Sequence, residues 1–342
     1  MNKILVTGGC GYIGSHTLVD LLDHGFEVVS ADNLCNSDEE VLKGIAAITG
    51  KQVHNYKTDL CDLEATRQIF VEHTDIVGII HFAALKSVSE SVTQPLLYFR
   101  NNLNSLLNIL DCMAHFGVPN LIFSSSCSVY GNTLELPVTE HSPWQEAESP
   151  YARTKQMGEH IICDVLQGTP NLQSIILRYF NPAGAHPSAL IGESPRNMAN
   201  NLVPVITETA IGKRPETVVF GDDYPTRDGS CIRDYIHIMD LAHAHTLALQ
   251  YLLQQRQTKQ VEVFNLGIGE GVSVLEAIQA FERNTGEHLS YRIGPRRPGD
   301  VMAIYADYHK AAERLGWQPH YSIDDIMQSA WNWEKARSTP SL

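Results

Sequence analysis

Short apolar runs alternate with segments of helical periodicity through the first half of the chain. The runs predict strands at residues 3–7, 26–31, 52–57, 76–82, 120–125 and 173–180. The run at 76–80 contains no polar residue, as expected for a strand covered on both faces. This alternation predicts a parallel sheet with helices on both sides.

The pattern changes after about residue 181. Proline and glycine become frequent at 182–195, 212–229 and 294–299, and the predicted elements become shorter. The chain has 342 residues, enough for two domains or one large α/β unit. We therefore expect one domain over 1–181 and a smaller, mixed α/β domain over 182–342, with some later segments returning to the first sheet.

A glycine-rich turn follows the first predicted strand. Residues 7–14 read Thr-Gly-Gly-Cys-Gly-Tyr-Ile-Gly and lead into a predicted helix at 12–24. Gly8 and Gly11 permit a tight turn and a close approach of phosphates, and Gly14 lets the helix pack on the sheet. The helix N-terminus then offers N–H donors to an anion. Because the motif lies between a strand and a helix, it predicts a dinucleotide-binding, Rossmann-type doubly wound sheet.

Two aspartates follow the next strands. Asp32 lies at the end of the second strand, near the expected distance of about 20 residues from the glycines. A carboxylate there accepts hydrogen bonds from ribose hydroxyls and repels a 2′-phosphate, which favours NAD over NADP; a cap or turn role is the alternative. Asp59 follows the third strand, where an adenine contact and capping of the next helix both fit the spacing.

Tyr151 and Lys155 form a Tyr-x-x-x-Lys pair on one face of a predicted helix. Ser149 and Pro150 precede them, as at a helix N-terminus. A nearby ammonium, the positive helix end and a cationic nicotinamide all favour the phenolate, so we expect the tyrosine to act as a base. Serines at 124–126 end the fifth predicted strand, where ligands of such sheets bind, and spacing alone does not choose among them.

Charge and cysteine content exclude several classes of protein. The net charge of −14 argues against a nucleic-acid or anionic-membrane surface, so an anionic substrate needs locally gathered arginines. The seven cysteines are scattered without a C-x-x-C pair, which predicts neither disulfides nor a zinc site. The fifteen histidines contain no H-E-x-x-H pair, and His243 and His245 lie on different helix faces. We therefore expect no metal site.

No membrane or export segment is evident in the sequence. The first strand begins at residue 3, which leaves no room for a signal peptide, and no apolar run reaches the roughly 18 residues that a membrane span needs. We expect a cytoplasmic protein.

Several motifs occur in an order that resembles one enzyme family. They are Thr7–Gly14, Ser124–Gly131, Tyr151–Lys155, Arg178–His186, Arg233–His237 and Arg297–Asp300. Together they resemble the UDP-glucose 4-epimerase family of extended short-chain dehydrogenase/reductases over nearly the whole chain. The resemblance implies tightly held NAD as cofactor, and UDP-glucose and UDP-galactose as substrates.

The resemblance also implies roles for individual residues. The catalytic residues are Ser126, Tyr151 and Lys155. The NAD contacts are Gly8, Gly11, Tyr12, Ile13, Gly14, Asp32, Asn33, Asp59, Leu60, Phe82, Ala83, Lys86, Asn101, Tyr151, Lys155 and Phe180. The UDP-sugar contacts are Lys86, Ser126, Tyr151, Asn181, Asn201, Leu202, Phe220, Arg233, Arg297 and Asp300. Arginines and amides suit a pyrophosphate, and Phe220 suits the uracil.

The implied reaction is a transient oxidation at the sugar C4 carbon. Tyr151 takes the proton of the C4 hydroxyl while hydride passes to the nicotinamide. The 4-keto sugar then turns within the site while UDP stays anchored, and hydride returns to the opposite face.

Three other functions remain open from the sequence. A nucleotide-sugar dehydratase needs an acid and a base directly after the strand-end serine, where this chain has Cys127 and Ser128. A UDP-N-acetylglucosamine/galactosamine 4-epimerase, or a dual-specificity enzyme, is a second alternative. The resemblance implies that small residues at the position of Ile304 make room for an N-acetyl group, and isoleucine is intermediate in size. An NAD-sensing binding protein has no need for the serine, tyrosine and lysine.

The resemblance further implies a homodimer. Two long predicted helices, at about 95–115 and 150–167, suit its interface. The first has more apolar surface than one sheet face covers, including Leu96, Leu103 and Leu107.

Overall fold

The computed structural model describes residues 2–133, 135–196, 198–297 and 300–339. Its central sheet has seven strands in the order β11-β6-β5-β4-β1-β2-β3, all of them parallel. The strands are β1 (Lys3–Thr7), β2 (Glu27–Ala31), β3 (His54–Tyr56), β4 (Ile76–His81), β5 (Asn120–Ser126), β6 (Gln173–Tyr179) and β11 (Val261–Leu266). The predicted doubly wound sheet is therefore confirmed, with strand ends within about two residues of those expected.

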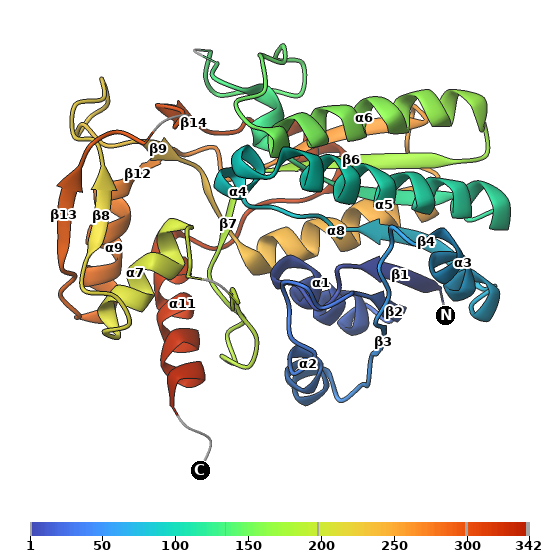
Figure 1. Cartoon of the computed structure of the whole chain (residues 1–342), viewed down its shortest axis with the longest axis horizontal. Helices are drawn as coiled ribbons and strands as arrows, with labels where there is room; N and C mark the ends of the chain where they lie inside the picture. The colour runs from blue at the N-terminus through green and yellow to red at the C-terminus, as the bar shows by residue number, and fades with distance from the viewer. Residues whose placement is uncertain (1, 134, 197, 298–299, 340–342) are drawn as a thin grey trace.

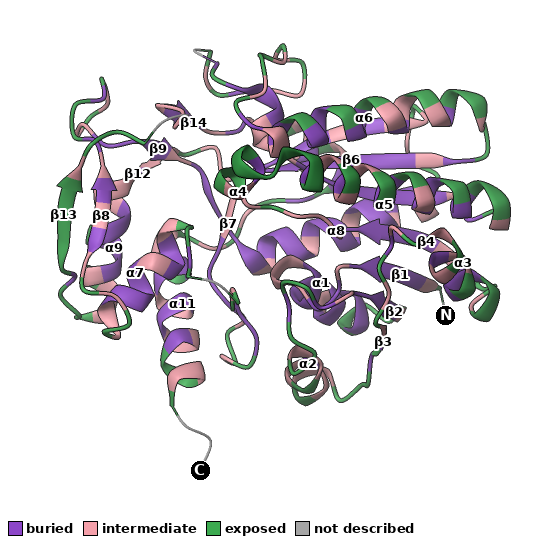
Figure 2. Ribbon diagram, in the orientation of Figure 1, coloured by how far each residue is buried: buried purple, intermediate pink, exposed green. Residues whose placement is uncertain are grey.

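Helices cover both faces of this sheet (Figure 1). On one face lie α1 (Tyr12–Asp23), α2 (Val41–Thr49), α8 (Ile238–Leu253) and α10 (His309–Leu315), and on the other lie α3 (Leu63–Glu72), α5 (Pro95–Phe116) and α6 (Pro150–Gly168). Successive residues of β1 point to opposite faces, since Ile4 and Val6 belong to the first core and Leu5 to the second. The central strands are largely buried, as Figure 2 shows.

Three elements from beyond residue 181, namely α8, α10 and β11, lie in this sheet layer. Helix α8 packs against α1, and β11 pairs with β6 from Val261 opposite Ser174 to Leu266 opposite Tyr179. The division into domains at residue 181 stays a prediction. The expectation of shorter elements in the second half is wrong for α8 and for α11 (Ile323–Ser338), which have 16 residues each.

The short helix α4 (Val88–Thr93) packs against α5 and α6. Most of the other elements form a second layer beside the carboxyl ends of the central strands (Figure 1). Its small sheets pair β10 (Tyr235–His237) with β7 (Asn181–Ala183), β13 (Tyr291–Gly294) with β8 (Thr217–Phe220), and β9 (Ile232–Arg233) with both β12 (Val272–Ser273) and β14 (Ala303–Ile304). A third core joins α7 (Leu202–Ala210), α9 (Val274–Thr285) and α11, with Phe281 edge-on to Trp331. Among the described residues, no helix is both long and apolar enough to cross a bilayer.

Candidate active site

The glycine turn lies where the strand order of the sheet reverses, between β1 and β4. Gly8 adopts φ +68°, and a Cβ on Gly14 would lie 2.2 Å from the Gly8 carbonyl oxygen. Only glycine permits this approach of α1 to the turn. Gly11 caps α1 without a side-chain hydrogen bond, so Tyr12, half-buried Ile13 and the following residue present free N–H groups. The turn therefore offers donors to an anion at the switch point.

The end of β4 is joined to this turn through β1. The Thr7 hydroxyl bonds His81 Nδ1 at 2.8 Å and accepts the backbone N–H of Ala83 at 3.3 Å. The backbone N–H of Phe82 donates to the Thr7 carbonyl oxygen at 3.1 Å. The predicted contacts Phe82 and Ala83 thus lie beside the glycines, and a Cβ on Gly8 would meet Ala83.

Asp32 is buried at the end of β2 and is tied to the same turn. One carboxylate oxygen accepts the backbone N–H of Cys10 at 3.1 Å, and the other accepts from Leu34 and Ser37 at 2.8 Å each. The turn role weighed from the sequence is therefore present. A carboxylate oxygen accepts about two hydrogen bonds, so the oxygen bonded to Cys10 keeps room for one more, whereas the oxygen bonded to Leu34 and Ser37 is already filled. The arrangement leaves Asp32 able to accept one ribose hydroxyl as well.

Asn33 and Asp59 each stabilise a local turn by accepting the backbone N–H two residues ahead. The alternative helix-capping role of Asp59 is wrong, because Asp62 caps α3 by accepting from Ala65. Leu60 is buried behind Asp59, and its carbonyl oxygen accepts from Asn108 at 2.8 Å.

Helix α6 begins as the sequence predicts. Ser149 is its N-cap, with its hydroxyl accepting the backbone N–H of Ala152 at 3.1 Å, and Pro150 is the first helical residue. Tyr151 therefore lies in the first turn. Lys155 follows one turn later and is almost fully buried.

The structure distinguishes the three serines at the end of β5. The Ser126 side chain lies near enough to the Tyr151 hydroxyl to lower the pKa of the phenol. The Ser125 hydroxyl instead donates to the buried Glu159 at 2.5 Å. Lys155 Nζ donates to the Ser124 carbonyl oxygen at 2.6 Å and lies 5.8 Å from the centre of the Tyr151 ring. Ser126 is thus the serine beside the tyrosine, as the family resemblance implies.

Burial opposes the charged forms of both Tyr151 and Lys155. Burial raises the pKa of Tyr151 to about 12, although the Ser126 side chain opposes this change. Burial also lowers the pKa of Lys155 to about 8, with Glu159 opposing. The protein by itself therefore favours the neutral phenol. The expected bias toward phenolate, which includes the positive charge of the nicotinamide, stays a prediction.

Four residues predicted to contact the substrate lie in two pairs in the second layer. Arg233 and Asp300 form an ion pair of 3.6 Å, and the Arg297 guanidinium lies 4.3 Å from the centre of the Phe220 ring. Pro298 and Gly299 of the same motif lie outside the described residues. Arginines gathered here are what an anionic substrate of this acidic protein needs.

Ile304 lies next to Arg233 in the register of β14 and β9. Its side chain is 5% exposed and packs in a cluster that includes Phe180 and, at its edge, Cys127. Burial raises the pKa of the Cys127 thiol to about 12, so this position supplies no acid for a dehydration.

Buried Asp234 positions the strands that carry these residues. Its backbone carbonyl accepts the N–H of Asn181, and its carboxylate accepts three further N–H groups, from Ile268, Gly269 and Ala306. Burial raises the pKa of Asp234 to about 6. No sequence pattern indicates this role, because the partners come from distant segments.

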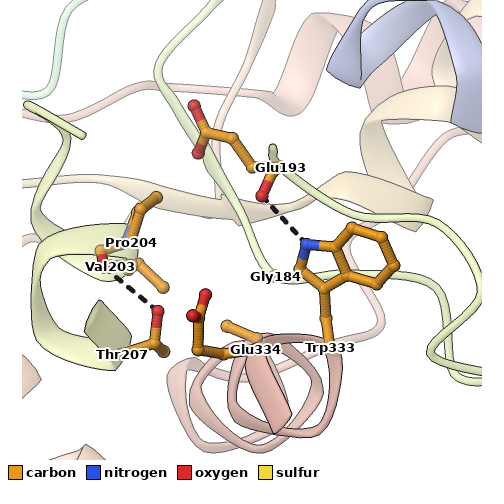
Figure 3. Close-up of a pocket in the computed structure, with 8 residues that line it drawn as sticks. Gly184, Glu193, Val203, Pro204, Thr207, Trp333 and Glu334 are labelled. Carbon is orange, nitrogen blue, oxygen red and sulfur yellow. Dashed lines mark hydrogen bonds between the residues drawn. The ribbon is translucent and has the colours of Figure 1, made fainter. Parts of the chain in front are cut away.

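Glu193 is a further residue that sequence reasoning missed. Its carboxylate accepts from Lys86 Nζ at 3.3 Å and from the Asn201 amide at 3.0 Å. Its backbone carbonyl accepts from Trp333 on α11 at 2.9 Å (Figure 3). One carboxylate thereby links Lys86, in the loop after β4, to Asn201, which precedes α7. Nothing in the local sequence around Glu193 marks this contact.

Three predicted residues lie beside these contacts. Tyr12 donates its hydroxyl to the Gly184 carbonyl at 2.6 Å, which ties α1 to the second layer. Leu202 is the first residue of α7, whose N-cap makes no side-chain hydrogen bond. The Asn101 amide donates to Asn102, and buried Asn102 exchanges hydrogen bonds with Leu85. Asn102, another residue that was missed, thus supports the loop that leads to Lys86.

Known proteins resemble this chain over nearly its whole length. The family model described as GDP-mannose 4,6 dehydratase matches residues 5–330. The UDP-glucose 4-epimerase of Neisseria meningitidis serogroup B is 46% identical over 333 residues, which are 97% of each chain.

Solved structures agree as well. The UDP-glucose 4-epimerase from Stenotrophomonas maltophila, with bound NAD and formylated UDP-arabinopyranose, has a TM-score of 0.95 at 46% identity and 99% coverage of both chains. The enzyme from Bifidobacterium longum, in complex with NAD+ and UDP, has a TM-score of 0.94 at 44% identity and 98% coverage of both chains. The chain therefore belongs to the UDP-glucose 4-epimerase family, within the wider family that the GDP-mannose 4,6 dehydratase model describes.

Proposed function

We propose that this protein interconverts UDP-galactose and UDP-glucose by a transient oxidation at the sugar C4 carbon with NAD. The observation that carries the proposal is the group of Ser126, Tyr151 and Lys155 at the carboxyl end of β5, in a sheet whose switch point holds the glycine turn. A binding protein that only senses NAD has no need for such a group. A dehydratase needs an acid that Cys127 does not supply.

The switch point fits NAD. The glycines at 8 and 14 let α1 pack closely on the turn, and the uncapped start of α1 supplies N–H donors for a pyrophosphate. Asp32 suits ribose hydroxyls and disfavours a 2′-phosphate. The remaining residues that would hold the cofactor are Asn33, Asp59, Leu60, Phe82, Ala83, Lys86, Asn101 and Phe180. When bound, NAD supplies a hydride acceptor and a positive ring charge.

Tyr151 is the proton carrier of the proposed mechanism. The Tyr151 hydroxyl lies near the Ser126 side chain. A C4 hydroxyl that reaches both residues can therefore pass its proton to the tyrosine oxygen. Lys155, fixed to the Ser124 carbonyl, lies close enough to stabilise the phenolate. On return, Tyr151 gives the proton back to the C4 oxygen, so the protein ends each turnover unchanged.

The second layer anchors the nucleotide. Arg233, Arg297 and the amides of Asn181 and Asn201 suit the diphosphate, together with the N–H of Leu202, and Phe220 offers an aromatic face to the uracil. Asp300 holds Arg233 in place. Anchoring through UDP leaves the sugar free to present either face to the same tyrosine.

The test is 4-epimerisation of UDP-galactose by the purified protein without added NAD, alongside Tyr151→Phe. We expect conversion to UDP-glucose, with a loss of about 10²–10⁴-fold in kcat in the variant. UDP-N-acetylgalactosamine is the second substrate, and buried Ile304 predicts a lower rate on it. Equal rates on both sugars would make the enzyme dual-specific. Absence of turnover on both, with NAD supplied, would refute the proposal.

We further propose a homodimer through α5 and α6. Leu96, Leu97 and Leu107 on α5, and Met157 on α6, are exposed although apolar. The two helices pack against each other at the edge of the molecule, where a second copy has access (Figure 2). Large exposed apolar side chains on two adjacent helices are typical of a protein interface.

We also propose that the protein is cytoplasmic. All seven cysteines are free thiols, which suits a reducing compartment.

A further inference from the structure

Two histidines and an aspartate from distant parts of the sequence meet on the surface of the sheet layer. Asp20 and His24 are one turn apart at the end of α1, and His243 lies on α8, 223 residues from Asp20. The two helices pack side by side (Figure 1). The cluster lies at the far end of α1 from the glycine turn, about 18 Å along a helix of this length. None of its members takes part in the proposed reaction.

The separations within this cluster match those between ligands of a metal ion. His24 Nδ1 lies 3.3 Å from one Asp20 carboxylate oxygen, and His243 Nδ1 lies 3.3 Å from the other. No two of the three potential ligand atoms are more than 4.8 Å apart. Zinc bonds of about 2.1 Å at tetrahedral angles place neighbouring ligand atoms about 3.4 Å apart. The cluster therefore already has nearly the spacing that coordination needs.

We propose that Asp20, His24 and His243 bind one divalent transition metal ion, for which Zn²⁺ is the test ion. Two imidazoles with one carboxylate suit zinc, cobalt or nickel, whereas magnesium and calcium prefer oxygen ligands alone. The histidine side chains are 37% and 36% exposed, so water has access to complete the coordination. Residues one turn apart on a helix lie on the same face, so the fold already places these two ligands side by side, as in other helical zinc sites.

Metal binding changes which ring nitrogen carries the proton. In the free protein, His24 Nδ1 donates to the Asp20 backbone carbonyl at 2.7 Å, and His243 Nδ1 faces the Asp20 carboxylate at 3.4 Å. Coordination through these two nitrogens requires each neutral ring to carry its proton on Nε2, and metal–nitrogen bonds replace the two hydrogen bonds. No electron is transferred. The bound ion would cross-link α1 to α8, which packs on it.

Our sequence-based expectation of no metal site considered only ligands that are neighbours in the sequence. Asp20 and His24 alone form a pair that is common on helices, and the third ligand becomes visible only once α8 is placed against α1.

The experiment is a calorimetric titration of the purified, chelator-treated protein with Zn²⁺. We expect one ion per chain, and a loss of affinity of about tenfold or more in His24→Ala and in His243→Ala. His288→Ala and His309→Ala are the matched controls. Each removes a histidine that pairs with a single carboxylate at 2.8 Å, and neither should change the affinity.

Co²⁺ absorption separates this site from a thiol site, because a cysteine ligand adds a charge-transfer band that nitrogen and oxygen ligands lack. Retention of the tight site in either His24→Ala or His243→Ala would overturn the proposal, as would its loss in Cys35→Ser or a complete absence of binding. Thermal unfolding checks that each variant is folded. Should His243→Ala not fold, His24→Ala decides, because His24 is exposed at the end of its helix.

Discussion

At the scale of single residues, the site depends on how burial and hydrogen bonds set the charge of Tyr151. Burial favours the neutral phenol, and Ser126 opposes it. A reactive tyrosine therefore needs each of its polar neighbours.

Ser126→Ala should raise the pKa of Tyr151, because the variant keeps the burial and loses the serine hydroxyl that opposes it. The active form is the phenolate, so the acidic limb of the pH profile of kcat should move to higher pH. If the pKa rises by one unit, the phenolate fraction at pH 7 falls about tenfold, and the rate falls with it.

The control is Ser125→Ala, which removes a hydrogen bond to Glu159 instead. It should lower the melting temperature and leave the position of the limb unchanged; a displaced limb in both variants would contradict the assignment.

Glu193 offers a second test at this scale, through two variants that separate its contacts. Glu193→Gln keeps an oxygen for the Asn201 amide but loses the charge that faces Lys86, whereas Glu193→Ala loses both. We expect KM for UDP-galactose to rise a few-fold in the first variant, since the exposed ion pair is worth only about 0–1 kcal/mol, and further in the second. Steady-state kinetics measure this, with exposed Glu287→Gln as control. Identical values in the two glutamate variants would exclude a role for the Asn201 contact.

At the scale of elements, the contact between α1 and the glycine turn allows no side chain at Gly14. Gly14→Ala places a methyl group 2.2 Å from the Gly8 carbonyl oxygen. We expect a loss of about 1–3 kcal/mol in stability and release of NAD during purification. Chemical unfolding and the absorbance of bound cofactor measure the two effects. Gly168→Ala is the matched control, because a Cβ there meets nothing within 4 Å. A Gly14→Ala protein that keeps its NAD would contradict the close approach.

What the sequence could predict follows from which contacts are local. The strand at 3–7, the glycine turn and the cap at Ser149 depend on neighbours in the sequence, and the structure agrees with all three. The sequence pattern could not show which of the three serines faces Tyr151, because that depends on where α6 packs. Glu193 and Asp234 were missed for the same reason, since their partners lie on other elements. The effect of burial on the pKa of Tyr151 was missed because burial is not visible in a sequence.

At the scale of the whole molecule, the exposed apolar side chains of α5 and α6 predict association. Leu107 is 44% exposed and Leu96 is 65% exposed. Leu107→Asp places a charge in the proposed interface, and its exposure means that the isolated chain should tolerate it. We expect the molar mass in sedimentation equilibrium to fall from two chains to one. Val71→Asp, on α3 and 55% exposed, is the control that should leave the mass unchanged. A wild-type monomer would refute the dimer.

The pairing of β11 with β6 has a consequence for biosynthesis. As the chain leaves the ribosome, β6 can join β5 soon after its own residues emerge, but its other edge stays open until Val261–Leu266 follow. At roughly 5–20 residues per second, the nascent sheet exposes a largely apolar edge strand for several seconds. Such an edge is a template for pairing with other chains. The last strand to arrive is thus the one that seals the sheet, and a ribosome that stalls before residue 261 leaves a product prone to aggregate.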